Sequence, residues 1–362
     1  MKVSREITDI TAHFLPLAGN DIIVTTFSNE IKRIGVNNWE HSFKGIKQPK
    51  LVYGNNLFVQ QRQEGSLNEG TGCIDLKTGR LKELNFLQSS VLLTSLLQES
   101  KVLARHKDQN RKKIIQLIDL NLLKPDWEID ADLQFIWGFD KGILGQLRGK
   151  SEIVFVDFMD GEIMWHYDLS KLDTYQDFDG SEKQIQITKI LEIHEDKIYI
   201  LLNSGKLLLL GSKSGEKITI LKNDKHAKFD TFGNSIEIDI LSNKLIQLAN
   251  QDLIEVDLKS LEVSITPIED MKSSGLENFS FFAYDSNHIY FTDKDHQTLG
   301  AVNRATHKLD WTHKLSQEGI SESERPRYGR ELKLNGDRLY VLDNKHTLHI
   351  FEKEAHPGYD RM

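Results

Sequence analysis

The stretch that decides the fold is Val156-Asp157-Phe158-Met159-Asp160-Gly161-Glu162-Ile163-Met164-Trp165, because near-copies of it recur along the chain. It consists of an apolar residue followed by Asp, a turn that contains Gly, and an alternating segment that ends in Trp. Alternating apolar residues on both sides of a Gly-containing turn are typical of two antiparallel strands joined by a hairpin. We therefore expect each copy to form a strand, a tight turn and a second strand.

Seven further positions carry this phrase in complete or degenerate form. The position of Asp157 recurs at residues 37, 75, 119, 212, 257, 303 and about 351, so successive copies are 38 to 55 residues apart. A period of this length is typical of propeller blades, each of which is a four-stranded antiparallel sheet. Another apolar strand precedes most copies, as at residues 197–202 and 338–342. Each repeat therefore contains enough strands for one blade.

A small sheet with two apolar faces is stable only when other sheets cover both faces, so the blades are expected to stack and close into a ring. We count eight blades in an all-β fold, with seven as the alternative if the degenerate first or third unit is miscounted. The last unit has no clear fourth strand, whereas an extra strand precedes the first unit. We expect a closing strand from Met1 to Ile7, a single domain over residues 1–362, and a short tail from Ala355 to Met362.

The phrase resembles the repeat of the PQQ-like β-propellers, the family of quinoprotein alcohol dehydrogenase-like folds. The full pattern of Asp, Gly and Trp is present only around Asp157, Gly161 and Trp165. Other copies have lost one or two of these residues: Gly is missing after Asp119, Asp257 and Asn303, and Trp is missing after Asp75, Ser212 and Asp257. The resemblance implies that the Asp-x-x-x-Gly turn joins the third and fourth strands and that the Trp packs between blades. Because propellers host many unrelated activities, it implies a fold rather than a function.

Charge and composition exclude some classes of partner. The chain has 362 residues, a formal net charge of −8 and an isoelectric point near 5.9, so bulk attraction to nucleic acid or anionic membranes is not expected. The basic run at residues 107–113 is expected to be a solvated hairpin tip. The first residues carry acidic side chains and no window of eighteen apolar residues occurs, which favours a cytoplasmic protein. Export is the alternative if a signal peptide has been removed.

No catalytic, cofactor or metal site is predicted. Cys73 is the single cysteine, which excludes a vicinal disulfide, and it is expected to be a small buried apolar residue. The loop acids Asp173, Asp177 and Asp179 lack the rest of a calcium-loop pattern, so a solvated acidic loop is expected there. The 13 histidines are scattered, without a zinc spacing. Those in or beside strands are interpreted as structural: His166, His194, His288, His307 and His313.

Three long loops are the predicted functional elements. They span residues 63–70, 172–183 and 317–329, and by the strand assignment they open on one rim, where loops vary without disturbing the sheets. Exposed aromatic and Arg side chains carry most of the energy of protein interfaces. The candidate partner-binding residues are Tyr175, Asp177, Phe178, Asp179, Arg325, Arg327, Tyr328 and Arg330. The alternative interpretation is that these loops plug the central funnel.

The functional hypothesis is a non-enzymatic, rigid interaction platform with a protein partner, either another subunit of an assembly or a toxin that the protein neutralises. The main alternative is an enzyme, or a small-molecule or sugar binder, with its site in the central funnel, where converging His, Arg, Asp and Tyr residues would be expected. A third hypothesis is a scaffold in envelope assembly, which requires an export signal.

Overall fold

The structure is a computed structural model, and it describes most of the 362 residues. The described residues are 1–28, 30–42, 46–62, 69–82, 90–93, 97, 100–107, 113–130, 132–139, 142–177, 179–222, 229, 236–278, 282–293, 297–316 and 329–353. The chain divides into two compact units, residues 13–231 and residues 1–12 with 232–362. The single domain over residues 1–362 stays a prediction.

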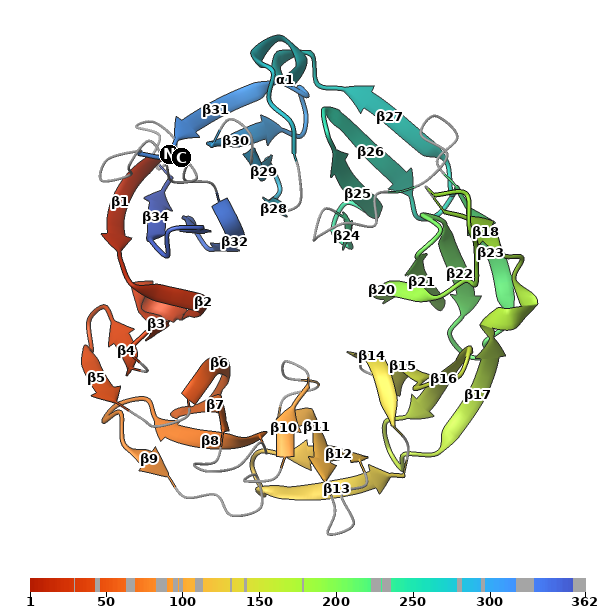
Figure 1. Ribbon diagram of the computed structural model, residues 1–362, viewed down its shortest axis with the longest axis horizontal. Coiled ribbons are helices and arrows are strands. Elements are labelled where there is room, and N and C mark those ends of the chain that lie inside the picture. The colour runs from red at the N-terminus through yellow and green to blue at the C-terminus, as the bar shows by residue number, and fades with distance from the viewer. Residues whose placement is uncertain are drawn as a thin grey trace, which may run out of the picture. The chain divides into compact units, whose positions relative to one another are not determined.

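The first unit, residues 13–231, contains blades 1 to 5, except for the first residues of β2. Each blade is a four-stranded antiparallel sheet in which strands that follow one another in sequence are neighbours (Figure 1). The strands are β2 (Ile10–Pro16), β3 (Ile22–Thr26), β4 (Glu30–Ile34) and β5 (Trp39–Ser42) in blade 1; β6 (Ile46–Tyr53), β7 (Asn56–Arg62), β8 (Glu69–Asp75) and β9 (Leu81–Lys82) in blade 2; β10 (Ser90–Leu92), β11 (Lys101–Lys107), β12 (Lys113–Asp119) and β13 (Lys124–Ile129) in blade 3; β14 (Leu133–Phe139), β15 (Gly142–Leu147), β16 (Glu152–Asp157) and β17 (Ile163–Asp168) in blade 4; and β20 (Ile187–His194), β21 (Lys197–Leu202), β22 (Leu207–Gly211) and β23 (Lys217–Leu221) in blade 5.

The second unit contains blades 6 to 8. Its strands are β24 (Ile236–Asp239), β25 (Lys244–Ala249), β26 (Asp252–Asp257) and β27 (Val263–Pro267) in blade 6; β28 (Phe282–Tyr284), β29 (His288–Asp293), β30 (Thr298–Asn303) and β31 (Leu309–Lys314) in blade 7; and β32 (Gly329–Asn335), β33 (Arg338–Asp343), β34 (Leu348–Glu352) and β1 (Lys2–Ile7) in blade 8. Figure 1 shows β1, in red, beside β34, in blue. The pairing is antiparallel, with Lys2 opposite Glu352 and Ile7 opposite Leu348.

The fold is therefore an eight-bladed β-propeller whose N-terminal strand completes the C-terminal blade. This confirms the blade count and the closing strand, and the alternative of seven blades is wrong. The predicted tail after Ala355 lies outside the described residues. One α-helix is present among the described residues, α1 (Glu269–Ser274), between blades 6 and 7.

The core lies between neighbouring blades. The second and third strands are buried on both faces, as in β15 and β22, which explains their continuous apolar sequences. The fourth strands are only partly covered, and β31 alternates between half-buried and exposed residues. In one cluster, Phe155 and Leu144 of blade 4 pack with Ile198 and Leu208 of blade 5. Stacking of this kind buries the faces that a single blade leaves exposed.

The Asp that recurs in the phrase has its role in the turn between the third and fourth strands. The Asp carboxylate accepts hydrogen bonds from backbone N–H groups two and three residues later, an Asx turn. In blade 2, Asp75 Oδ1 accepts from Lys77 N at 3.0 Å and Thr78 N at 2.9 Å. The hydrogen bond from Thr78 N and the ammonium of Lys82 lower the pKa of Asp75 to about 2. Asp157 and Asp257 accept in the same way.

The Trp residues of the repeated phrase pack between blades, as the resemblance implies. The Nε1–H groups of Trp39, Trp127 and Trp165 donate to carbonyl oxygens of the following blade, those of Leu76, Phe158 and Ser212, at 2.7, 2.8 and 2.9 Å. Each indole also lies over the turn glycine of that blade: Gly79, Gly161 or Gly215. In blade 7, Trp311 donates instead to Met1 O of the closing strand at 3.0 Å.

One equivalence drawn from the sequence is wrong by one residue. The Asp position of blade 5 is Gly211, not Ser212, because Gly215 N donates to Gly211 O just as Gly161 N donates to Asp157 O. Gly211 has no side chain to accept a hydrogen bond, and the polar residue next to it, Ser212, resembles a turn acid in the sequence.

Candidate functional site

The candidate site is the insertion between blades 4 and 5, which we call the blade 4–5 insertion and define as residues 169–186. It begins with η3, a short 3-10 helix (Leu169–Lys171), and continues into a two-stranded hairpin, β18 (Tyr175–Gln176) and β19 (Glu182–Lys183). Asp168 starts η3 by accepting from Ser170 N at 2.9 Å. Hydrogen bonds from Ser170 lower the pKa of this carboxyl. The insertion is therefore ordered from its first residue.

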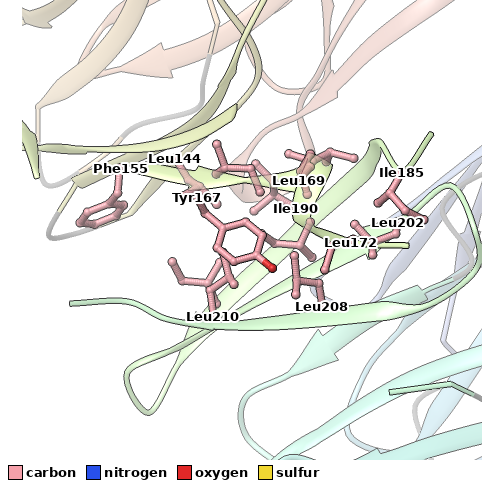
Figure 2. Close-up of a cluster of buried hydrophobic side chains, with 14 of the residues drawn as sticks. Leu144, Phe155, Tyr167, Leu169, Leu172, Ile185, Ile190, Leu202, Leu208 and Leu210 are labelled. Atoms are coloured by element: carbon pink, nitrogen blue, oxygen red, sulfur yellow. The ribbon is translucent and has the colours of Figure 1, made fainter. Parts of the chain in front are cut away.

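Apolar side chains anchor the insertion to the core between blades 4 and 5. Leu169, Leu172 and Ile185 are buried in the same cluster as Ile190 and Leu202, and Figure 2 shows these side chains lying together. Tyr175 packs against this cluster and is half-buried. Burial of a Leu or Ile side chain contributes about 1.5–3 kcal/mol. Both ends of the hairpin are therefore fastened to the blades.

Polar contacts lock the tip of the hairpin. Asp177 N donates to Ser181 O, and Gly180 N donates to Asp177 O, each at 2.9 Å. Asp179 Oδ1 accepts from Ser181 N at 2.9 Å, and the hydrogen bonds from Ser181 lower the pKa of Asp179. Lys183 forms an ion pair with Asp177, which raises the pKa of its ammonium group. Thr174 donates to Glu182 across the base of the hairpin.

The structure brings three of the predicted partner-binding residues together in this hairpin, with different exposure. Asp179 is exposed, Asp177 is half-buried, and Tyr175 is half-buried against the core rather than exposed as expected. The reason is that Tyr175 begins a strand whose inner face meets the apolar cluster. Phe178 lies outside the described residues.

Arg330 is the described member of the second predicted group and belongs to blade 8. It lies in a β-bulge near the start of β32, because Gly329 pairs with Asp343 and Glu331 pairs with Leu342. The extra residue of a bulge is left unpaired in the ladder, and Arg330 is exposed. Arg325, Arg327 and Tyr328 lie outside the described residues, as do residues 63–68 of another predicted loop.

Two of the three loop acids, Asp177 and Asp179, are engaged in protein contacts. Asp177 pairs with Lys183, and Asp179 accepts from Ser181. Among the described residues, no group of three or more His, Cys, Asp or Glu side chains is arranged to hold a metal ion. The structure gives these acids a structural part in the hairpin.

Three of the strand histidines have local partners in the structure. His288 is 3.0 Å from Asp310 Oδ2, and His166 is 3.8 Å from Glu152 Oε2. His313 stacks on Trp311, with ring centroids 6.0 Å apart. Burial lowers the pKa of His313. These contacts fit the expected structural roles of the strand histidines.

Cys73 is buried in β8 between blades 2 and 3, as predicted. Burial raises the pKa of its thiol to about 11. A buried thiol that stays protonated near neutral pH is a poor nucleophile. Cys73 therefore belongs to the core.

The sequence analysis missed the hairpin itself and its two apolar anchors. Strands of two residues are too short to show periodicity. The signals that were present are the Asp179-Gly180 pair, which favours a hairpin turn, and the apolar residues Leu172 and Ile185 on either side of a polar segment.

Comparisons with known proteins support the fold alone. No family model matches the chain, and a search of curated proteins finds no match. Among solved structures, BamB from Moraxella catarrhalis is 13% identical with a TM-score of 0.58, and the alignment covers 97% of this chain and 99% of that one. The β-propeller domain of Cps50 (Swd1) from Myceliophteria thermophila is 12% identical, with a TM-score of 0.51 and coverage of 86% and 98%.

A computationally designed protein, Ika8, is similar to the same degree. It is 11% identical, with a TM-score of 0.56 and coverage of 97% of this chain and 98% of that one. Since even a designed chain shares this fold, the fold alone does not indicate an activity. No helix among the described residues is both long enough and apolar enough to span a membrane.

Proposed function

We propose that the protein is a non-enzymatic interaction platform that receives a protein partner on the blade 4–5 insertion. The observation that carries this proposal is the construction of the hairpin. Its base is held by Leu172 and Ile185 in the core, and its tip by the contacts of Asp177 and Asp179. A loop that is ordered before binding loses little conformational entropy on association, which improves affinity.

The charge on the exposed side of the insertion indicates which kind of partner would bind there. Its charged side chains are Lys171, Asp173, Asp177, Asp179, Glu182 and Lys183, four acids against two bases. Complementary charge accelerates association and suppresses wrong partners. The expected partner therefore presents Lys or Arg side chains to Asp179 and Glu182, both of which are exposed.

The test compares two charge-reversal variants in affinity capture from lysate of the source cells. One variant carries Asp179→Lys and Glu182→Lys in the insertion, and hydrogen exchange of its hairpin peptide shows whether loss of the Ser181 and Thr174 contacts also loosens the hairpin. The matched control carries Glu216→Lys and Glu262→Lys, exposed acids in the turns between the third and fourth strands of blades 5 and 6. We expect the insertion variant to lose a partner that the control and the wild-type protein retain. Equal capture by all three proteins would place the interface elsewhere, and capture of nothing would count against a platform.

The platform is proposed to act in the cytoplasm, either as a subunit of an assembly or as a protein that neutralises a toxin. Cell fractionation with an antibody to the native protein tests the location. Size-exclusion chromatography of the captured complex distinguishes a stable assembly from a transient partner. An envelope location would instead favour the scaffold hypothesis.

We also propose kinship with the PQQ-like propellers. It is supported by the Trp39, Trp127 and Trp165 contacts with the following blade, which are the features the resemblance implies. The kinship concerns the repeat and not a cofactor.

A binder of a small molecule or sugar is the second candidate, and Trp137 is the observation that favours it. Trp137 lies on β14, the first strand of blade 4, and is 38% exposed. First strands line the channel of a propeller, and an exposed indole there offers a stacking surface. Fluorescence titration with mono- and oligosaccharides tests this candidate. A response that Trp137→Ala abolishes would support it, and no response would count against a sugar ligand.

A further inference from the structure

The outer strand of blade 4, β17, has an edge that no other strand covers in the described part of the chain. It pairs with β16 alone, and Figure 1 shows it as the outermost strand of its blade. The pairing is regular from Trp165 to Asp168, after a bulge at Met164. An edge of this kind presents unpaired backbone N–H and C=O groups, which can pair with a strand of another chain.

The sequence of β17 lacks the features that protect most edge strands. Proteins keep their edges from pairing with other chains by means of charged residues, above all Lys, by Pro, or by very short strands. β17 has six residues, and none of them is Lys, Arg or Pro. Of the other outer strands, β1, β9, β13, β23, β27 and β31 each contain at least one of these three residue types, and β5 has only four residues. β17 is therefore the outer strand that is best suited to accept a further strand.

The ladder between β16 and β17 shows which backbone groups face outward. In an antiparallel pair, positions that exchange both hydrogen bonds alternate with positions that exchange none. Leu169 N donates to Ser151 O at 2.7 Å, just beyond the end of the strand. The bonded positions within β17 are therefore Tyr167 and Trp165. The N–H and C=O of His166, which lies between them, point away from β16 and toward the open edge.

Exposed apolar side chains lie at the start of the same edge. Met159, in the turn before β17, is 83% exposed, and the bulge residue Met164 is 54% exposed. The equivalent bulge residues of blades 3 and 7 are Asp126 and Asp310, and each contacts a Lys or His side chain of its own blade. Blade 4 thus replaces a paired acid with an exposed thioether, and Met side chains adapt readily to the surface of a partner.

The charges around β17 decide which kind of strand fits its edge. Residues 156–168 contain four acids and neither Lys nor Arg, and His166 lies 3.8 Å from the carboxylate of Glu152. Of these acids, Glu162 is exposed before the strand and Asp168 is half-buried at its end. A second copy of β17 added antiparallel would bring Glu162 of one copy toward Asp168 of the other, and like charges opposite each other destabilise a sheet. The edge therefore favours a foreign strand with Lys or Arg at its ends over a second copy of this chain.

We propose that β17 receives an extended, basic segment of a partner protein, which adds a further strand to blade 4. The backbone of the segment pairs with His166, one of its apolar residues covers Met164, and its Lys or Arg residues meet Glu162 and Asp168. In complexes of this type the main-chain hydrogen bonds supply affinity and the side chains supply specificity. The edge is a surface separate from the blade 4–5 insertion, so the outcome of its test is independent of the test of the insertion.

Synthetic peptides added to the intact protein test this proposal. The probe is a peptide of alternating Val and Thr with a central Met and with Lys and Arg at both ends, and its control has Glu in place of Lys and Arg. Calorimetric titration measures the affinity of each, and we expect the acidic peptide to bind at least about tenfold more weakly. Hydrogen exchange should show that the basic peptide protects the segment Ile163–Asp168. No binding of the basic peptide, or binding without this protection, would overturn the proposal.

Two proline variants separate pairing with β17 from general attraction to an acidic protein. Pro is tolerated on an edge strand where its missing N–H would face solvent, so His166→Pro removes the outward donor and leaves the ladder with β16. Thr312→Pro is the matched control, because Thr312 is exposed and follows Trp311 in β31 as His166 follows Trp165 in β17. We expect His166→Pro to weaken binding of the basic peptide about tenfold and Thr312→Pro to leave it unchanged. Equal affinity of the two variants would contradict the assignment to β17.

Modified peptides cover the case in which a variant does not fold. N-methyl groups on alternate residues remove the donors from one edge of a peptide strand and leave the other edge intact. Of two basic peptides methylated on opposite edges, one should lose its affinity for the wild-type protein and the other should keep it. If neither methylation weakened binding, backbone pairing would be excluded. Sedimentation of the protein alone tests the second copy: a dimer that His166→Pro dissociates would show that β17 pairs with itself and would overturn the proposal.

Discussion

The indole of Trp127 in blade 3 lies directly on Gly161 in blade 4. A Cβ atom on Gly161 would be 3.0 Å from Cδ2 of the indole, and the backbone of Gly161 has a φ of +78°. Trp127 Nε1 also donates to Phe158 O in the same turn at 2.8 Å. Glycine is required at this position for two reasons: the backbone is left-handed, and the indole leaves no room for a side chain.

Substitution of Gly161 should lower the free energy of unfolding by more than the strain of its left-handed backbone alone. In Gly161→Ala we expect a loss of about 1–2 kcal/mol from the left-handed backbone and about 1–3 kcal/mol more from crowding of the indole. Gly149→Ala is the matched control, because Gly149 has a φ of +75° and nothing within 4 Å of an added Cβ. Urea unfolding measures the free energy of unfolding of the two variants and of the wild-type protein. Equal losses in the two variants would show that the indole exerts no steric demand.

Loss of the Lys353 ammonium should change the response to acid. Burial alone would raise the pKa of Asp285, but Lys353, whose Nζ is 2.6 Å from Asp285 Oδ2, and the amides of Asn287 and His288 outweigh it and lower the pKa. A lowered folded-state pKa stabilises the protein above the unfolded value, about 3.9 for Asp, and this stability is lost as the pH falls through the folded value.

We therefore expect Lys353→Met to destabilise the protein by about 1–3 kcal/mol at neutral pH and by progressively less below about pH 4. Thermal unfolding of both proteins between pH 3 and pH 7 measures the difference. Lys259→Met, at an exposed residue of the turn after β26, is the control for loss of a positive charge. A difference that stayed constant down to pH 3 would contradict the assignment to Asp285.

The anchor of the hairpin can be weakened without changing its exposed surface. In Leu172→Ala we expect the hairpin peptide to lose protection against hydrogen exchange, with an overall loss of about 2–5 kcal/mol if the cavity stays open. Asp173→Ala, at the neighbouring exposed residue, should leave protection unchanged. If Leu172→Ala also left it unchanged, the polar contacts of the tip alone would hold the hairpin.

The thiol of Cys73 should be unreactive in the folded protein. It is 1% exposed, and burial raises its pKa to about 11. We expect no labelling by iodoacetamide at pH 8 and one label per chain after unfolding in urea. Rapid labelling of the native protein would show that β8 opens readily.

Blade number and the closing strand could be predicted because blade strands are buried on two faces and leave long apolar segments in the sequence. The sequence also indicates which neighbouring blades are joined by a contact between Trp and Gly. In the Asp-x-x-x-Gly turn, the last position is Gly only where the preceding blade carries the Trp. The pairs are Trp39 with Gly79, Trp127 with Gly161 and Trp165 with Gly215. Where that Trp is missing, residues with side chains adopt the positive φ instead: Leu123, Leu261 and His307.

Only the location of the candidate site could be predicted from the sequence. A long insertion marks where a loop departs from the repeat, but two-residue strands leave no periodic signal, so β18 and β19 were not foreseen. Tyr175 shows the same difficulty, because an aromatic residue in a polar loop has the composition of an interface even when it faces the core. The contact between Glu6 of β1 and His349 of β34 joins residues 343 positions apart, and no local pattern announces it.

Blade 8 pairs two strands that are far apart in the sequence, Lys2–Ile7 and Leu348–Glu352. During synthesis the segment Lys2–Ile7 must therefore remain without its native partner until Leu348–Glu352 has been translated. A cell that makes this protein has to keep that segment from pairing elsewhere, and a ribosome that stalls before residue 348 releases a chain in which blade 8 cannot form.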